Sequence, residues 1–351
     1  MKIFTIILGT RFSVLMRMIF RNGITPYPVY IARFMMLFIN SLISSALILA
    51  EKKNFRRKIR ETRLTEAPVF IIGHWRTGST LLHQLLNLDP QFTAPTMVQT
   101  TIPDHFLFST KYYLPILKKA MPKTRPMDNV PLSPLQPQED EFALIRMGSV
   151  SPMEKLIFPS GEGYFLDGYE HYIPQGRKLE AWKKNLLAFY KKISFLEGRS
   201  IVSKNPYHTM RMELLAGMFP GAKFIHITRD PMMVVPSTIR MWNIIARENK
   251  LKKDWKEPTV AETATVLRTY LDHVAEYRHR LDNPFTEVRF EELEKSPISV
   301  LKKIYSELEI PWTDGFETAV HEFLWVNEGF EKNTYELSTE ERNAIQSICQ
   351  S

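Results

Sequence analysis

Short apolar runs alternate with longer amphipathic segments from residue 68 to the end of the chain. Apolar runs of this length are typical of strands that are buried on both faces. They occupy residues 69–72, 200–203, 223–228 and 287–290. The longer segments predict helices at residues 80–88, 207–218, 231–247, 263–281 and 300–308. Because strands that alternate with helices form a parallel sheet, the pattern predicts an α/β fold with helices on both faces of the sheet.

The first 62 residues follow a different pattern. Residues 1–19 are apolar with scattered basic side chains, and residues 29–50 are more apolar still, with Arg33 and Asn40 inside them. A basic run comes next, formed by Lys52, Lys53, Arg56, Arg57, Lys58 and Arg60. We therefore expect hydrophobic and basic helices at residues 1–62, before a larger domain at residues 63–351.

The length and charge of this N-terminal stretch indicate contact with a membrane. About 20 apolar residues are enough to span a bilayer. Basic side chains beside such a stretch can contact anionic headgroups, which favours helices that lie in or on the cytoplasmic leaflet. A transmembrane anchor and an ordinary pair of helices packed on the domain are the alternatives. The expected location is the cytoplasm, at the inner face of the cytoplasmic membrane.

A strand, a glycine-bounded loop and a helix follow one another at residues 69–88. The loop, residues 73–80, has the sequence GHWRTGST, and its glycines allow backbone N–H groups to surround an anion. Ser79 stands where the Walker pattern GxxxxGK[ST] has its lysine. Because that lysine neutralises the β- and γ-phosphates, its absence disfavours an NTPase. Arg76 supplies a cation at another position, so the loop predicts a P-loop-like site for a different anion.

A second candidate anion site follows the strand at residues 223–228. Arg229 leaves the carboxyl end of this strand, where ligands gather in doubly wound sheets, and Ser237 lies further along the chain. A guanidinium and a hydroxyl together suit a terminal phosphate. The two can meet one anion only if the chain between them bends. A plain helix start with Asp230 as N-cap is the alternative.

Composition narrows the chemistry. The 351 residues include one cysteine, Cys349, so the chain can form neither a disulfide framework of its own nor a zinc site built on cysteines, which fits a reducing compartment. The net charge is +8, which suits anionic nucleotides or anionic lipid. No nucleic-acid-binding module is recognisable, so nucleic acid is not an expected partner.

Together the motifs resemble those of a known family. Residues 75–80 resemble the 5′-phosphosulfate loop of sulfotransferases that use PAPS (3′-phosphoadenylyl sulfate), and residues 219–231 with Ser237 are similar to the family's 3′-phosphate segment. Residues 137–142 and 203–206 resemble a bacterial branch related to tyrosylprotein and cytosolic sulfotransferases. The resemblance covers the chain from residue 68 onward and implies a sulfotransferase with PAPS as co-substrate and no metal.

The resemblance also implies roles at the 5′ end of the nucleotide. Arg76 would contact the bridging oxygen and the phosphosulfate. The residues after it, Thr77, Gly78, Ser79 and Thr80, would donate backbone and hydroxyl hydrogen bonds to the same group. Catalysis would consist mainly of positioning and charge stabilisation.

Four more positions complete the implied nucleotide site. Lys204 matches a lysine near the transferred group, with a surface lysine before a helix as the alternative. Arg229 and Ser237 would hold the 3′-phosphate, which distinguishes PAPS from ATP. Lys332 would come from a C-terminal loop that closes over the nucleotide.

The acceptor hydroxyl needs a general base. His105 is our first candidate, because imidazole titrates near neutral pH. The acids Glu139, Asp140 and Glu141 are rivals, although they could equally cap the helix expected from residue 142.

The acceptor itself is inferred from location. A membrane-associated enzyme suggests a hydrophobic alcohol such as a sterol or another lipid, whereas a glycan, a phenol or a peptide is the alternative. A P-loop kinase and a non-catalytic nucleotide sensor are more remote readings. The oligomeric state stays open.

Overall fold

The computed structural model describes residues 5–125, 127, 130–161, 172–328 and 333–350. These residues belong to two compact units that are interleaved along the chain. The helical unit comprises Met1–Leu64, Pro95–Gly198 and Arg240–Pro258, and the sheet unit comprises Thr65–Ala94, Arg199–Ile239 and Thr259–Ser351. The expected division at residue 62 therefore falls near the end of the first segment of the helical unit. A separate N-terminal part and a domain at residues 63–351 stay a prediction.

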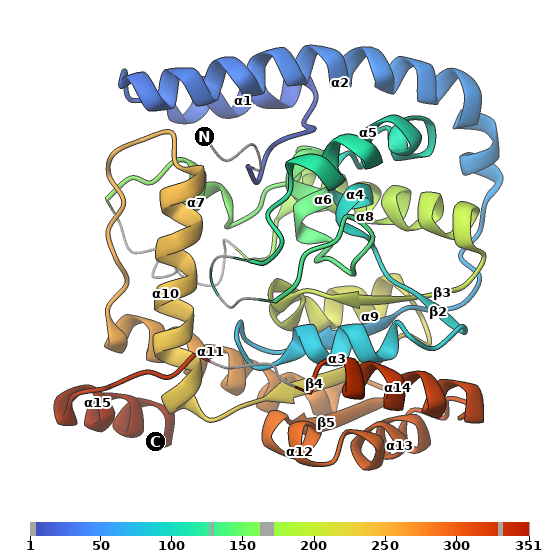
Figure 1. Ribbon diagram of the computed structural model, residues 1–351, viewed down its shortest axis with the longest axis vertical. Coiled ribbons are helices and arrows are strands. Elements are labelled where there is room, and N and C mark those ends of the chain that lie inside the picture. Colours follow the sequence, from blue (N-terminus) through green and yellow to red (C-terminus); the bar gives the residue numbers. More distant parts are fainter. Residues whose placement is uncertain (1–4, 126, 128–129, 162–171, 329–332, 351) are drawn as a thin grey trace. The chain divides into compact units, whose positions relative to one another are not determined.

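The sheet unit contains a parallel sheet of five strands in the order β2-β3-β1-β4-β5 (Figure 1). The strands are β1 (Val69–Ile72), β2 (Phe92–Thr93), β3 (Ser200–Lys204), β4 (Lys223–Thr228) and β5 (Phe285–Arg289). Neighbouring strands in the centre are joined by long crossovers, as parallel pairing requires. The predicted parallel α/β sheet is confirmed.

Alternate residues of β1 pack on opposite faces of the sheet. Val69 and Ile71 join an apolar cluster with side chains of α3 (Ser79–Leu86), α13 (Pro297–Glu307) and α14 (Asp314–Val326). Phe70 points the other way, where its ring lies 5.9 Å from that of Phe219 and 5.5 Å from that of Phe224. Both faces are therefore covered, which is why the strand reads as a continuous apolar run.

The remaining elements of the sheet unit follow the same order along the chain. They are the 3₁₀ helix η2 (Pro206–Arg211), α9 (Met212–Met218), α10 (Pro231–Asn249), α11 (Val260–Tyr277), η3 (Arg278–Arg280), α12 (Phe290–Lys295) and α15 (Thr339–Gln350). The last residues of α10, from Arg240, belong to the helical unit.

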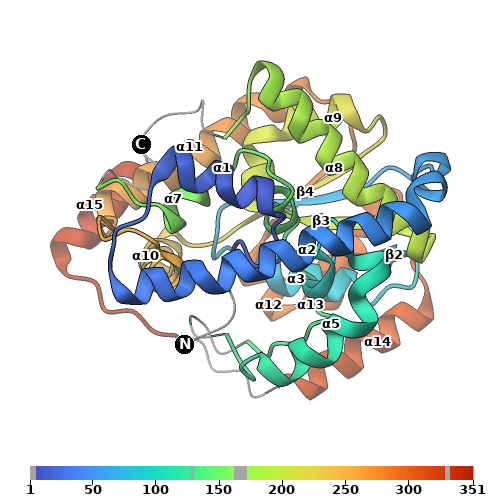
Figure 2. The same cartoon turned by 90° about the horizontal axis from the view of Figure 1, so that it is seen from above.

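The helical unit is built around α2 (Pro28–Glu61), which packs against three other helices. These are α1 (Phe12–Asn22), α5 (Phe106–Ala120) and α8 (Gly176–Glu197), and Figure 2 shows α1 and α2 side by side. Shorter helices complete the unit: α4 (Met97–Thr101), α6 (Glu141–Arg146) and α7 (Glu154–Ile157). The apolar stretch at residues 29–50 and the basic run after it form the single helix α2, whereas the described part of the stretch at residues 1–19 leads into α1. By length and composition α2 could cross a membrane, and 28% of its apolar window is buried.

Candidate active site

The loop after β1 is fixed at its first residue. Gly73 has φ of 139°, and a Cβ there would lie 2.4 Å from the carbonyl oxygen of Ile227 in β4. The hydroxyl of Thr209 accepts a hydrogen bond from the Gly73 N–H (2.7 Å) and donates one to the Gly73 carbonyl (3.0 Å). Because the loop starts this close to a neighbouring strand, only glycine fits at its entrance.

The second half of the loop turns directly into α3. The Thr77 hydroxyl donates to the carbonyl of His74 (2.8 Å), so this side chain holds the loop closed. Arg76 has φ of 69° and Gly78 has φ of 87°, both left-handed. Gly78 is the N-cap of α3, and a Cβ there would lie 2.0 Å from the Phe290 ring. Ser79 and Thr80 open the helix, where backbone N–H groups lack helical acceptors and favour an anion.

Aromatic rings pack against the buried side chain of Trp75 in the loop. The Trp75 ring is buried, 4.9 Å from the ring of Tyr207 and 5.3 Å from that of Tyr270. His74 is buried beside it, and burial lowers the pKa of this imidazole to about 4. His74 is therefore neutral near pH 7 and packs in the core of the sheet unit.

Arg76 connects the two candidate anion sites. Its Nε donates to the Ser237 hydroxyl at 2.8 Å, and the Arg229 guanidinium donates to the Arg76 carbonyl at 3.2 Å. The hydroxyl of Tyr335 also donates to Ser237, at 3.1 Å. Asp230 accepts from the Met232 N–H (2.9 Å) at the start of α10, as expected of an N-cap, while Arg229 and Ser237 each contact Arg76.

Arg229 is held in a partly buried position beside another cation. Its guanidinium lies 4.4 Å from the centre of the Phe290 ring. Burial, with a contribution from nearby Arg76, lowers the pKa of Arg229, although Glu294 and Glu291 oppose this shift. An open pocket of about 430 Å³ borders it, lined by Arg229, Asp230, Pro231, Met233, Arg289, Phe290, Glu291 and Glu294. A bound anion would relieve the repulsion between the two guanidinium groups.

Three cations leave the carboxyl ends of three neighbouring strands. Lys204 is the last residue of β3, pairs in register with Ile71 of β1, and is 6% exposed. Arg76 follows β1, and Arg229 follows β4 directly. This edge of a doubly wound sheet is the usual place for ligands, and its positive charge fits an anionic one.

The candidate bases all lie in the helical unit. His105 is fully buried; its Nδ1 lies 2.9 Å from the Ser109 hydroxyl, and burial with nearby Lys192 lowers the pKa of the imidazole to about 3. Asp140 is buried and accepts from the Tyr190 hydroxyl at 2.6 Å.

The two glutamates differ in access to solvent. Glu141 is the first residue of α6 and is fully buried, whereas Glu139 precedes the helix and is partly exposed. Asp140 is the N-cap of α6, but its side chain makes no capping bond there. Among the four candidates, only Glu139 has a partly exposed side chain.

Lys332 lies outside the described residues. In the part of the chain that is described, no group of three or more His, Cys, Asp and Glu side chains is placed to hold a metal ion.

Sequence reasoning missed Thr209, Tyr335 and Phe290. Each contacts the loop or its partner residues through long-range packing. The signals in the sequence are faint: Thr209 follows the strand 200–203, and Tyr335 lies close to Lys332, which was expected to close the site.

Comparison with known proteins gives one consistent picture. A family model described as "Sulfotransferase family" matches residues 68–314. Two proteins named omega-hydroxy-beta-dihydromenaquinone-9 sulfotransferase Stf3, from Mycobacterium bovis and Mycobacterium tuberculosis, are each 35% identical over 348 residues, covering 96% of this chain and 87% of theirs.

Two crystal structures are similar in fold. Sulfotransferase STF9 from Mycobacterium avium has a TM-score of 0.70 and 18% identity, with 97% of this chain and 95% of that chain covered. Sulfotransferase STF1 from Mycobacterium tuberculosis has a TM-score of 0.62 and 17% identity, with coverages of 96% and 90%.

Proposed function

This chain belongs to the sulfotransferase family, and from that premise we propose that it transfers the sulfuryl group of PAPS to a hydroxyl of a lipid-like alcohol. The observation that carries the proposal is the hydrogen bond from Arg76 Nε to the Ser237 hydroxyl at 2.8 Å. It brings the loop after β1 to the segment that contains Arg229. A nucleotide with an anionic group at each end would fit two such sites side by side.

We assign the two ends of PAPS to these two sites. The phosphosulfate would lie at the start of α3, with Gly78, Ser79 and Thr80 donating from the backbone and Arg76 beside the bridging oxygen. The Thr77 hydroxyl is engaged within the loop, so Thr77 would contribute through its backbone. The 3′-phosphate would lie against Arg229.

The proposed reaction is an in-line displacement at sulfur. The bond from sulfur to the bridging phosphate oxygen breaks, the acceptor oxygen forms a new bond to sulfur, and its proton passes to a base. Negative charge develops on the bridging oxygen, where Arg76 and Lys204 would stabilise it. We therefore propose transfer that uses protein cations and no metal.

We propose Glu139 as the general base, ahead of His105. A base must reach the acceptor hydroxyl and take up its proton, and Glu139 is partly exposed. His105 is fully buried, and an imidazole with a pKa of about 3 holds a transferred proton poorly. Glu139→Gln should lower kcat by about 10²-fold or more, whereas His105→Asn should change it much less. The reverse order would restore His105 as the base.

The lipid acceptor is supported by a relative and by α2. The relative that shares 35% identity carries the name of an enzyme for a hydroxylated dihydromenaquinone. The exposed apolar side chains of α2 also suit an enzyme that works at the inner face of the cytoplasmic membrane. A quinone lipid is therefore a better first acceptor to test than a sterol.

A P-loop kinase is the second candidate function, but it is opposed by Ser79 in place of the Walker lysine. A non-catalytic nucleotide sensor would bind adenosine 3′,5′-bisphosphate without transferring sulfate to any acceptor.

The test is transfer of ³⁵S from labelled PAPS to a panel of acceptors. The panel holds a hydroxylated menaquinone, a sterol, a phenol, a glycan and a tyrosine peptide, and a parallel assay offers the same panel γ-³²P-labelled ATP with Mg²⁺. We expect label on the lipid alcohols. Label on glycan or peptide alone would overturn the lipid acceptor, and phosphate transfer from ATP would overturn the reaction.

A further inference from the structure

The outer face of α2 is apolar where it is exposed. We define this outer face by its large exposed side chains, which are 47% to 68% exposed: Ile31, Met35, Ile39, Leu42, Ile43 and Leu49. From Ile31 to Leu49 the other exposed residues are alanines, so no polar side chain interrupts the stripe. The stripe follows the helical repeat for 18 residues, or about 27 Å.

The opposite face of α2 is buried and partly polar. Its buried residues are Tyr30, Leu37, Ser41, Ser44, Ile48 and Glu51. A helix on a water-exposed surface normally places apolar side chains inward and polar ones outward. In α2 the exposed face is apolar and the buried face mixes apolar and polar side chains, which is the arrangement expected where the solvent is lipid.

Arg33 and Asn40, which interrupt the apolar stretch, both contact other segments of the helical unit. Arg33 donates to the carbonyl of Lys250 at 2.6 Å. Asn40 accepts from the Gly9 N–H at 2.8 Å through its side-chain oxygen. These contacts explain how an apolar outer face coexists with a charged residue in the same stretch.

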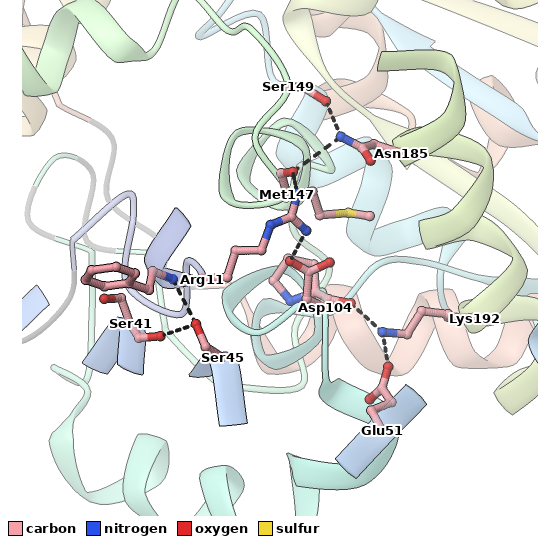
Figure 3. Close-up of polar contacts among 11 residues, drawn as sticks. Arg11, Ser41, Ser45, Glu51, Asp104, Met147, Ser149, Asn185 and Lys192 are labelled. Atoms are coloured by element: carbon pink, nitrogen blue, oxygen red, sulfur yellow. Dashed lines mark hydrogen bonds and ion pairs between the residues drawn. The ribbon is translucent and has the colours of Figure 1, made fainter. Parts of the chain in front are cut away.

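Further polar contacts fasten α2 to its unit (Figure 3). The Ser45 hydroxyl accepts from the Phe12 N–H at 2.9 Å and donates to the Ser41 carbonyl at 2.8 Å. Glu51 forms a buried ion pair with Lys192 and accepts from the Phe108 N–H at 3.1 Å. These ties extend along the helix, so α2 cannot leave the unit without exposing several buried polar groups.

A charged layer lies behind the buried face. Arg11 donates to Asp104 and to the Met147 carbonyl, each at 3.0 Å, as Figure 3 shows. Arg146, which is 6% exposed, donates to the carbonyls of Leu8 and Thr100, each at 2.8 Å. A bilayer-spanning α2 would carry this layer into hydrocarbon, where ionised side chains are costly.

Basic side chains are exposed on the last turns of the same helix. They are Lys52, Lys53, Arg56, Arg57, Lys58 and Arg60. One acidic side chain offsets them there, since Arg57 pairs with Glu61 at 2.9 Å. This positive charge complements anionic lipid headgroups. It therefore indicates that the partner of the adjoining apolar face is an anionic membrane.

We propose that α2 lies in the plane of an anionic membrane and does not span it. The outer face would enter the acyl region, and the basic side chains would lie among the headgroups. This inference deepens the membrane association of the proposed function. It is tested by vesicle binding in the absence of PAPS and acceptor. The result therefore does not depend on whether the protein transfers a sulfuryl group.

Vesicle flotation tests the surface. The full chain should float with vesicles of phosphatidylcholine and phosphatidylglycerol, and much less with phosphatidylcholine alone. Ile39→Glu with Leu42→Glu should lower the bound fraction on the anionic vesicles about tenfold or more. Lys52→Glu with Lys53→Glu should remove the preference for phosphatidylglycerol.

The matched control is Val326→Glu, an exposed apolar residue on α14 in the sheet unit that is 74% exposed. It should float like the wild type. All variants should keep the wild-type circular dichroism spectrum, since every altered side chain is exposed. Wild-type protein that ignores both vesicles, or that self-associates through this face instead, would overturn the proposal.

Spin-label depth separates the two membrane arrangements. Single nitroxides are placed at Ile31→Cys, Ile39→Cys and Leu49→Cys in a Cys349→Ser background. An in-plane helix predicts the same depth for all three labels. A spanning helix predicts a deep label at 39 and shallow ones at 31 and 49, and that profile would contradict the proposal.

Discussion

Gly78 lies against the Phe290 ring. A single added carbon would clash, because a Cβ at Gly78 would lie 2.0 Å from the ring. The same ring also lies against the Arg229 guanidinium. A change at Gly78 therefore reaches both the loop and the cation proposed to hold the 3′-phosphate.

We predict that Gly78→Ala disrupts nucleotide binding as well as stability. Gly198→Ala is the matched control, since Gly198 is also left-handed (φ 64°) but a Cβ there meets no atom within 4 Å. The control should lose about 1–2 kcal/mol of unfolding free energy and bind adenosine 3′,5′-bisphosphate normally. Gly78→Ala should lose more stability and bind at least about tenfold more weakly. Equal losses in urea unfolding and calorimetry would refute the steric argument.

The buried histidines lead to a second prediction, which concerns how the free energy of unfolding depends on pH. Burial lowers the pKa of His105 to about 3, and those of His74 and His273 to about 4. The folded protein keeps these rings neutral, whereas the unfolded chain takes up protons below about pH 6.5. Stability should therefore be flat with respect to these groups above pH 6.5 and fall below it, by about 1.4 kcal/mol per pH unit for each histidine.

His105→Gln isolates one of these protons. Between pH 6 and pH 4.5 the unfolding free energy of the variant should fall less steeply than that of the wild type, by about one proton's worth of slope. Above pH 7 the two curves should run parallel. Parallel curves at all pH values would mean that His105 exchanges protons freely in the folded state.

The candidate cations were predictable from the sequence because they follow the ends of strands. Lys204 ends β3, Arg229 follows β4 directly and Arg76 lies four residues after the end of β1, and the sheet brings their positions to one edge. Thr209 and Tyr335 were not predictable, because their contacts depend on how distant segments pack. Burial, which weakens His105 as a base, is likewise invisible in a short stretch of sequence.

Among the elements, α2 shows what the structure adds to the composition of a segment. The sequence showed an apolar stretch and a basic run, but only the packing shows that the buried side of the helix carries Ser41, Ser44 and Glu51. The strands β1 and β4 were predicted at their true bounds because they are short, apolar and delimited. The two-residue β2 is too short to leave a pattern.

The helix predicted at residues 207–218 is α-helical only in its second half, α9. Residues 207–218 begin as the 3₁₀ helix η2 before α9. Asn205 accepts from the Tyr207 N–H at 3.0 Å, and the Thr209 hydroxyl accepts from the Gly73 N–H, so this turn is constrained by its contact with the loop after β1. Local propensity does not contain that constraint.

The buried pair Glu51–Lys192 joins α2 to α8 and yields a prediction for the elements. The two residues are 2% and 5% exposed. Lys192→Met leaves a buried carboxylate without its partner and should cost about 3–5 kcal/mol. Adding Glu51→Gln should recover part of that loss.

Urea unfolding measures both effects. Arg57→Ala is the matched control, because it breaks an exposed ion pair of the same helix and should cost no more than about 0.5 kcal/mol. If Lys192→Met costs as little as Arg57→Ala, the pair does not fasten α2 to its unit.

At the scale of the whole molecule, the chain passes repeatedly between two units. The sheet unit collects three separate stretches of sequence, and the helical unit collects the others. The sequence predicted the sheet and its ligand edge but placed one boundary at residue 62. Which stretches pack together depends on long-range contacts, and these leave no marker in composition.

The same division separates the assigned groups. The cations Arg76, Lys204 and Arg229 belong to the sheet unit, whereas Glu139, the proposed base, belongs to the helical unit. The sheet unit alone therefore carries the proposed nucleotide site, and nucleotide binding can be tested without knowledge of the acceptor.

Calorimetry with adenosine 3′,5′-bisphosphate tests the central claim most directly. The wild type should bind this ligand and discriminate against AMP, which lacks the 3′-phosphate. Arg229→Ala should weaken binding by about 30-fold or more, since it removes a partly buried cation from a phosphate. Arg289→Ala, which alters an exposed arginine of the same pocket, should change it little. If the wild type binds AMP and the bisphosphate equally, or if Arg229→Ala binds like the wild type, the assignment of a 3′-phosphate site is wrong.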